Sequence, residues 1–385
     1  MCLSTQKFAH IGKVYDMKAF SAPGRVEIGG NHTDHQHGRV LAAAINMEAK
    51  CIATPNGTNL IRITDTQYGL ETVDISDLAV REDEKGTSAA LIRGVAAWFK
   101  NKGHAIGGFD GNISSDIPSG SGLSSSAAFE VLIGNVFKGL FGSAVTPLDI
   151  AIAGQYAENI YFGKPCGLMD QAASSFGGLV MIDFQDPDDP VVKKIPFNLP
   201  DHLLCVVDTI GNHADLTDEY AYVTTEMKAI ANHFGKDYLR ELAPELFYEK
   251  IAELRKYGDR AVLRAIHFFN ENERVLSQAK ALEEGRINDF LDLIIESGLS
   301  SQTCLQNIYP SGSILTQEVN LGLQVSAQIL GGKGAWRVHG GGFAGTILAF
   351  VPISLKYEYQ KRMFGVFGRN CCHFLTIRSE GGIEL

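Results

Sequence analysis

The stretch GGNHTDHQHG, residues 29–38, places three imidazoles and one carboxylate close together along the chain: His32, Asp34, His35 and His37. Groups of these types at such short spacing suit either coordination of a metal ion or hydrogen bonding to a small polar ligand. The alternative is that these residues have only a structural role, as a polar turn between two strands. Arg25, in the strand-like run just before the cluster, adds a cation and favours the small polar ligand.

The metal interpretation lacks a ligand. The run HTDH is similar to the H-x-H-x-D-H run of metallo-hydrolases, but the first histidine position is Gly30 here. Zinc sites need three or four ligands in a tetrahedral array. Four of the other histidines show no ligand-like spacing: His104, His202, His213 and His339. The residues therefore favour a polar-ligand site over a zinc site.

A glycine- and serine-rich loop, PSGSGLSSSAA from Pro118 to Ala128, indicates a phosphate-binding site. Glycines let backbone N–H groups approach a ligand, serines add hydroxyl donors, and the N-terminus of a following helix attracts anions. A flexible linker is the alternative. A linker would not continue into AAFEVLIGNVF, which is apolar enough to predict a buried helix.

The other glycine pattern carries less information. No G-x-x-x-x-G-K-[ST] run occurs, which argues against a Walker-type nucleotide site. A literal GxGxxG is formed by Gly340, Gly342 and Gly345. The dinucleotide-binding version must open a helix, whereas the following TILAFV predicts a strand, so a tight hairpin is the simpler interpretation.

The elements that position these residues mix strands and helices without strict alternation, which predicts an α+β fold. Residues 22–75 are strand-rich, with Asn56-Gly57 as a hairpin signal. Helices are predicted at 88–103, from Ser125 onward, at 146–163 and over much of 215–297. Strands are predicted at 177–184, from 201 and on both sides of the last glycine turn. The charged turn DPDDP predicts a domain boundary, which gives domains 1–190 and 191–385.

Bulk composition limits the possible partners. The chain has 385 residues and a net charge of −10, so two domains are expected and a general nucleic-acid surface is not. The seven cysteines form no CxxC pair, as is typical of reduced thiols. No apolar run approaches the roughly 18 residues of a membrane helix, and the first residues lack the apolar core of a secretory signal. We expect a cytoplasmic protein that does not bind membranes, of undetermined oligomeric state.

Four blocks together carry a family resemblance. PSGSGLSSSAA resembles the second signature of the GHMP small-molecule kinases, P-x-G-x-G-L-G/S-S-S-A. APGRVEIGGNHTDHQHGRVLAAAI resembles the first signature of galactokinases, HGGGFAGTILAFV resembles the third, and PCGLMDQAASSFGG resembles the galactokinase loop that carries an aspartate. The resemblance implies a two-domain GHMP architecture with its active site in the interdomain cleft. It also implies ATP-dependent phosphorylation of the anomeric hydroxyl of galactose to galactose 1-phosphate.

The resemblance also assigns roles to residues. Asp170 would accept or orient the hydroxyl proton, and Arg25 would stabilise the γ-phosphoryl charge and keep Asp170 ionised. Ser126 and Glu158 would hold Mg²⁺. The implied sugar contacts are Asn31, His32, Asp34, Gly167 and Tyr220. The implied ATP contacts are Pro118, Gly120, Ser121, Gly122, Leu123, Ser124, Ser125, Ser126, Gly341 and Gly342. Taken singly, Asp170 could be a helix cap, Tyr220 a packing residue and Glu158 a solvated one.

The chain departs from the family pattern at the sugar site. Galactokinases usually read G-R-V-N-x-I-G-E-H-T-D-Y, whereas this chain reads GRVEIGGNHTDH, with Asn31 at the glutamate position and His35 at the tyrosine position. That glutamate contacts the sugar near O6 in the family, and a glutamate repels a C6 carboxylate where an asparagine does not. The run DHQ also resembles the galacturonokinase version. Galacturonate is therefore an alternative substrate, and a catalytically silent sugar- and ATP-binding regulator is an alternative function. The intact Asp170, Arg25 and Gly/Ser loop favour the enzyme.

Overall fold

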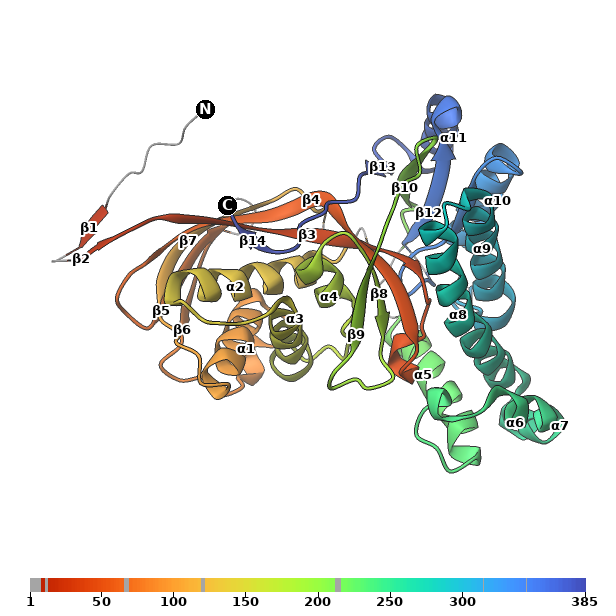
Figure 1. Ribbon diagram of the computed structural model, residues 1–385, viewed down its shortest axis with the longest axis horizontal. Coiled ribbons are helices and arrows are strands. Elements are labelled where there is room, and N and C mark those ends of the chain that lie inside the picture. The colour runs from red at the N-terminus through yellow and green to blue at the C-terminus, as the bar shows by residue number, and fades with distance from the viewer. Residues whose placement is uncertain are drawn as a thin grey trace.

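The computed structural model describes residues 8–10, 13–65, 69–118, 122–211, 216–313, 315–343 and 345–385. Within these ranges the chain forms two main β-sheets, with helices packed against them (Figure 1). Long runs of helix and strand occur without strict alternation along the chain, which confirms the predicted α+β class.

The larger sheet has the order β14-β3-β4-β7-β5-β6, and β8 and β9 continue from β4. Helices α1 to α4 lie on one side of it (Figure 1). The strands are β3 (Lys18–Gly29), β4 (Arg39–Pro55), β5 (Leu60–Asp65), β6 (Gly69–Asp74), β7 (Phe109–Ser115), β8 (Leu179–Asp183), β9 (Val191–Ile195) and β14 (Ile383–Glu384). The helices are α1 (Ser88–Asn101), α2 (Ser125–Phe141), α3 (Pro147–Tyr156) and α4 (Met169–Phe176). A separate hairpin joins β1 (Phe8–His10) and β2 (Lys13–Tyr15).

The second sheet has the order β11-β12-β10-β13. Its strands are β10 (His202–Asp208), β11 (Ala335–Val338), β12 (Thr346–Pro352) and β13 (Cys372–Leu375). The helices of this half are α5 (Thr217–His233), α6 (Pro244–Glu249), α7 (Ile251–Leu254), α8 (Asp259–Glu283), α9 (Ile287–Ser300), α10 (Glu318–Leu330) and α11 (Lys356–Phe367). No helix in the described ranges is both long and apolar enough to cross a bilayer.

Local sequence signals account for several helix boundaries. Thr146 caps α3 through its hydroxyl and Pro147 occupies the first turn, and Asp149 completes a capping box. Helix α2 begins at Ser125 and ends before Gly142, which has a positive φ. One apolar cluster includes Phe20 of the larger sheet and Phe350 of the second, so the two sheets share a core.

Two predicted features are wrong. The Asn56-Gly57 turn does not connect a paired hairpin, because β7 lies between β4 and β5 in the sheet. The domain boundary at 190/191 falls inside an antiparallel hairpin of β8 with β9. The larger sheet therefore extends past residue 190, and it also receives β14 from the C-terminal end of the chain.

Candidate active site

Arg25 and Asp170 form the centre of the candidate site. Arg25 lies in β3 and is 6% exposed, and Asp170 lies in the first turn of α4. Arg25 Nε is 2.6 Å from Asp170 Oδ1, and Arg25 Nη2 is 2.7 Å from Oδ2. This two-pronged geometry fixes both side chains, because a planar guanidinium matches a carboxylate edge to edge. The structure thus brings together the two residues predicted as catalytic.

The Gly/Ser loop is joined to this ion pair. Arg25 donates to the carbonyl of Gly122 through Nη1, and its backbone N–H donates to the Leu123 carbonyl at 3.1 Å. Ser124 Oγ donates to Asp170 Oδ2 at 2.5 Å. Gly122 has φ +72°, and a Cβ there would lie 2.7 Å from Thr346 Oγ1, so only glycine fits. Two predicted nucleotide contacts, Gly120 and Ser121, lie outside the described residues.

The electrostatics keep Asp170 ionised. Burial by itself raises the pKa of this carboxyl, but Arg25 and the Ser124 hydroxyl outweigh burial, so the pKa of Asp170 lies below its usual value. Oδ2 accepts from both Arg25 and Ser124, whereas Oδ1 accepts only from Arg25 among these contacts. Since a carboxylate oxygen accepts two hydrogen bonds, Oδ1 can take a further donor.

The predicted magnesium residues lie next to each other. Glu158 belongs to the π-helical segment Ala157–Phe162, is 3% exposed, and accepts from Ser126 Oγ at 3.4 Å. Lys164 Nζ lies 3.4 Å from the same Glu158 oxygen. Gln171 Nε2 donates to Glu158 Oε2 at 2.9 Å and to buried Glu130 Oε2 at 2.9 Å. A hydroxyl beside a fixed carboxylate suits a hard cation whose remaining ligands are water and phosphate.

Four of the five predicted sugar residues surround one corner of the site. Asp34 lies in the short helix Asp34–Gln36, and a Cβ on Gly167 would lie 2.0 Å from Asp34 Oδ2. Gly167 is therefore the residue type that leaves room for the Asp34 carboxylate. His32 and Tyr220 have ring centroids 6.5 Å apart at an interplanar angle of 25°. Tyr220 Oη donates to the Gly342 carbonyl at 3.1 Å.

Burial tunes the ionisable groups in this corner. It raises the pKa of Asp34 to about 6 and lowers the pKa of His32 to about 4, so His32 is a neutral imidazole near pH 7. His32 Nε2 is 2.9 Å from the Gly341 carbonyl, and Nδ1 is 3.3 Å from His35 Nε2. His37 is separate from this pair and stacks on Tyr238, with the two ring centroids 3.6 Å apart. Within the described ranges, no three histidine, cysteine or acidic side chains are placed to hold a metal ion.

Asn31 does not have the environment that the sequence predicts for it. The side chain is fully buried. Its amide nitrogen donates to Glu27 Oε1 and Gly340 O, and its amide oxygen accepts from Asn307 and Ser301. A primary amide has two donor hydrogens and two acceptor lone pairs, so no position remains for a sugar hydroxyl. The Asn31 side chain therefore has no free hydrogen-bonding position for a sugar, contrary to its predicted role.

The third glycine loop connects the two halves of the site. The carbonyls of Gly341 and Gly342 contact His32 and Tyr220, and a Cβ on Gly341 would lie 2.5 Å from the Tyr220 ring. On the other side, Thr346 and His339 lie against Gly122. The loop thus braces both the sugar corner and the Gly/Ser loop. Contact of Gly341 and Gly342 with nucleotide stays a prediction, as it does for Pro118, Leu123 and Ser125.

Two sets of buried polar residues behind the site were not predicted from the sequence. Glu130 and Gln171 support Glu158, while Glu27 forms an ion pair with Arg337 at 2.8 Å. Gln171 follows Asp170 directly in the sequence, and that proximity was the available signal. No local signal links Glu27 to a residue 310 positions away.

Comparison with known proteins agrees with this geometry. The model of the GHMP kinases N terminal domain matches residues 90–178, and the galactokinase galactose-binding signature matches residues 6–55. The chain is 32% identical to a galactokinase of Glaesserella parasuis serovar 5, over 90% of this chain and 88% of the relative. It is 31% identical to a galactokinase of Mannheimia succiniciproducens, over 88% of this chain and 86% of the relative.

Solved structures agree in fold. A Lactococcus lactis galactokinase complexed with galactose superposes with TM-score 0.85 at 24% identity, covering 96% of this chain and 95% of that one. A mevalonate kinase superposes with TM-score 0.66 at 15% identity, covering 94% of this chain and 99% of that one. The fold is therefore that of the GHMP kinases, and the sequence relatives are galactokinases over nearly their full length. This chain belongs to the galactokinase family.

Proposed function

We propose that this protein transfers the γ-phosphoryl group of ATP to the anomeric hydroxyl of galactose, with Mg²⁺ as cofactor. The observation that carries the proposal is the joined unit of Arg25, Asp170 and the Gly/Ser loop. In this unit the Arg25 guanidinium bonds the ionised Asp170 carboxylate and the Gly122 carbonyl of the loop, and the Ser124 hydroxyl of the loop bonds the same carboxylate. The curated relatives named galactokinase support the choice of sugar.

In this proposal Asp170 receives the sugar hydroxyl. The anomeric hydroxyl donates to Oδ1, the oxygen with remaining capacity. Its proton passes to the carboxylate as the hydroxyl oxygen bonds the γ-phosphorus and the bond from that phosphorus to the β–γ bridging oxygen breaks, which releases ADP. An acid whose pKa is lowered is a weak base, so much of its effect is orientation of the attacking oxygen. Arg25 holds that orientation and places positive charge beside the transferring group.

The nucleotide phosphates are assigned to the start of α2. Free backbone N–H groups and the positive end of the helix dipole favour phosphate there. Ser126 and Glu158 would hold Mg²⁺ against the phosphates, and the chemistry that the ion supplies is neutralisation of their charge. Lys164, 66% exposed and paired with Glu158, adds a cation at the same edge.

The proposal is tested by coupled ADP release over a panel of neutral hexoses and hexuronates. We expect ATP- and Mg²⁺-dependent turnover with galactose and the sugar 1-phosphate as product. Preferred turnover of galacturonate would instead establish a galacturonate 1-kinase. Binding of galactose and ATP without any turnover would establish a silent regulator and contradict the proposal.

Galactose binding is expected to release a proton near pH 6. Burial raises the pKa of Asp34 to about 6, so roughly half of the molecules carry a protonated Asp34 at that pH. A sugar hydroxyl donating to this carboxylate favours its ionised form, which expels the proton. For the same reason kcat/KM should rise with pH and level off above about 6. Calorimetry in two buffers of different ionisation enthalpy measures the released proton.

The Asp34→Asn variant provides the control. Its residual galactose binding should be independent of the buffer at pH 6. Glu27 is the other nearby carboxyl with a raised pKa, of about 7. Proton release that persists in Asp34→Asn would assign the titration to another group such as Glu27, and the role given to Asp34 would be wrong.

A further inference from the structure

Glu27 carries the negative charge closest to the Asn31 amide. Glu27 Oε1 accepts from Asn31 Nδ2 at 2.9 Å and from Arg337 Nη2 at 2.8 Å. The Glu27 and Arg337 side chains are 4% and 0% exposed. Arg337 is held by further bonds to the carbonyls of Ile28 and Val338, so it cannot follow another partner without breaking them. The ion pair joins β3 of the larger sheet to β11 of the second.

The chemistry of this contact requires one amide and one carboxylate. Asn31 donates to Glu27 and accepts from Asn307 and Ser301, so its amide uses both of its functions. Two carboxylates at 2.9 Å would repel each other, and two amides would leave the buried Arg337 without an ion pair. The contact therefore tolerates an exchange of the two residue types better than a change of either one alone.

That exchange accounts for two of the positions at which this chain departs from the galactokinase signature. In G-R-V-N-x-I-G-E-H-T-D-Y, asparagine stands at the position of Glu27 and glutamate at the position of Asn31. We propose that Glu27 and Asn31 are one exchanged pair, which keeps one carboxylate and one amide at these two positions beside the sugar corner and thereby retains selectivity for a neutral hexose over a hexuronate. Glu27 is then a specificity-determining residue, and Asn31 alone does not admit a C6 carboxylate. The selectivity part rests on the proposed function; the exchange itself does not.

The electrostatic basis is the set of charges around Glu27. Burial opposes the charge of Glu27 most strongly and raises its pKa to about 7, whereas Arg337 and Arg25 favour its ionised form and Asp34 is the nearby anion that opposes it. Arg25 is itself engaged by Asp170. A substrate carboxylate entering this corner would add a further negative charge where Asp34 and Glu27 are already present, and low-dielectric surroundings strengthen that repulsion.

The exchange is tested by a thermal-stability cycle. Asn31→Glu and Glu27→Asn should each lower the Tm, the first by repulsion and the second by stranding Arg337. The double variant Glu27→Asn/Asn31→Glu should have a Tm close to that of the natural protein, so that most of the sum of the two single Tm losses is recovered. Independent effects that simply add would overturn the exchange, and so would a double variant that fails to fold.

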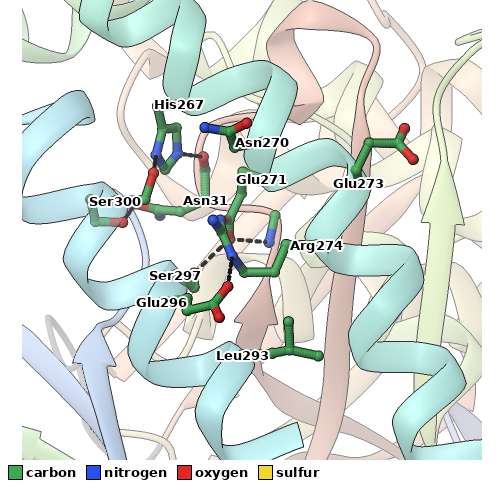
Figure 2. Close-up of polar contacts among 12 residues, drawn as sticks. Asn31, His267, Asn270, Glu271, Glu273, Arg274, Leu293, Glu296, Ser297 and Ser300 are labelled. Carbon is green, nitrogen blue, oxygen red and sulfur yellow. Dashed lines mark hydrogen bonds and ion pairs between the residues drawn. The ribbon is translucent and has the colours of Figure 1, made fainter. Parts of the chain in front are cut away.

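Glu271 offers a matched control. It is a fully buried carboxylate that accepts from Gly30 N at 3.1 Å and from Ser297, and it pairs with Arg274, but it does not bond the Asn31 side chain (Figure 2). His267 and Asn31 meet through the Asn31 backbone carbonyl in the same view. Glu271→Gln combined with Asn31→Glu should show no recovery. If Glu271→Gln restored as much of the Tm lost in Asn31→Glu as Glu27→Asn does, removal of any buried charge would compensate that variant. This result would overturn the specific pairing of Glu27 with Asn31.

Selectivity is tested by Glu27→Gln, which removes the charge with little change of shape. The ratio of kcat/KM for galacturonate to that for galactose should rise at least about tenfold over the natural protein. The exchanged double variant should return the ratio toward its natural value. An unchanged ratio in Glu27→Gln would overturn the specificity role. Failure of the natural protein to phosphorylate galactose would contradict the proposed function, while the Tm cycle would still decide the exchange.

Discussion

Replacement of Asp170 by asparagine is expected to lower kcat by ~10²–10⁴-fold while the protein stays folded. The amide cannot accept the hydroxyl proton, and its NH₂ group would face one arm of the Arg25 guanidinium instead of accepting from it. Initial rates from coupled ADP release give the effect on turnover. Circular dichroism and calorimetric ATP binding should remain close to those of the natural protein.

Ser124→Ala is the matched control for Asp170. It removes one hydrogen bond to the same carboxylate and leaves both bonds from Arg25 in place. We expect a much smaller loss of turnover from it than from Asp170→Asn. Near-normal turnover in Asp170→Asn would show that another group receives the proton and that Asp170 is a structural residue.

Replacement of Arg25 by lysine is expected to reduce both stability and turnover. Lysine keeps the charge, but it cannot bond both Asp170 oxygens and the Gly122 carbonyl with a planar fork. Removing one partner of a buried ion pair costs about 3–5 kcal/mol, and we expect a smaller loss here because lysine keeps the charge and the Asp170 side chain is 30% exposed. Arg25 opposes the effect of burial on the pKa of Asp170, and lysine would oppose it less. The pKa of Asp170 should therefore rise in this variant, and the acid limb of the kcat profile should move to higher pH.

Arg39→Lys separates the two effects. Arg39 pairs with Asp183 at 2.7 Å, with side-chain exposures of 16% and 19%. The other polar partners of these two side chains in the described part of the chain include Asn272, Glu273 and Arg240, none of which is a candidate site residue. This variant should lose stability without moving the acid limb of the kcat profile. If Arg25→Lys behaved in the same way, the role of Arg25 beside the transferring group would be wrong and the pair would be purely structural.

The comparison of Arg25 with Asn31 shows where sequence reasoning succeeded. Both were placed in the sugar and phosphoryl site by their position in one signature. Arg25 meets its predicted partner Asp170 because both motifs specify that contact. The role given to Asn31 did not hold, because its side chain is engaged by nearby Glu27 and by three residues from distant parts of the chain, Ser301, Asn307 and Gly340.

The sequence by itself determined the features that short stretches encode. Helix α2 follows from a buried apolar run, the start of α3 follows from its capping box, and the Gly/Ser loop follows from the need for close backbone approach. Only the tertiary structure decided the insertion of β7 between β4 and β5, the β8–β9 hairpin across the predicted boundary, and the burial of Glu27 with Arg337. Caps and helix periodicity act within a few residues, whereas strand order and buried ion pairs join segments separated by tens to hundreds of residues, whose proximity exists only once the chain has folded.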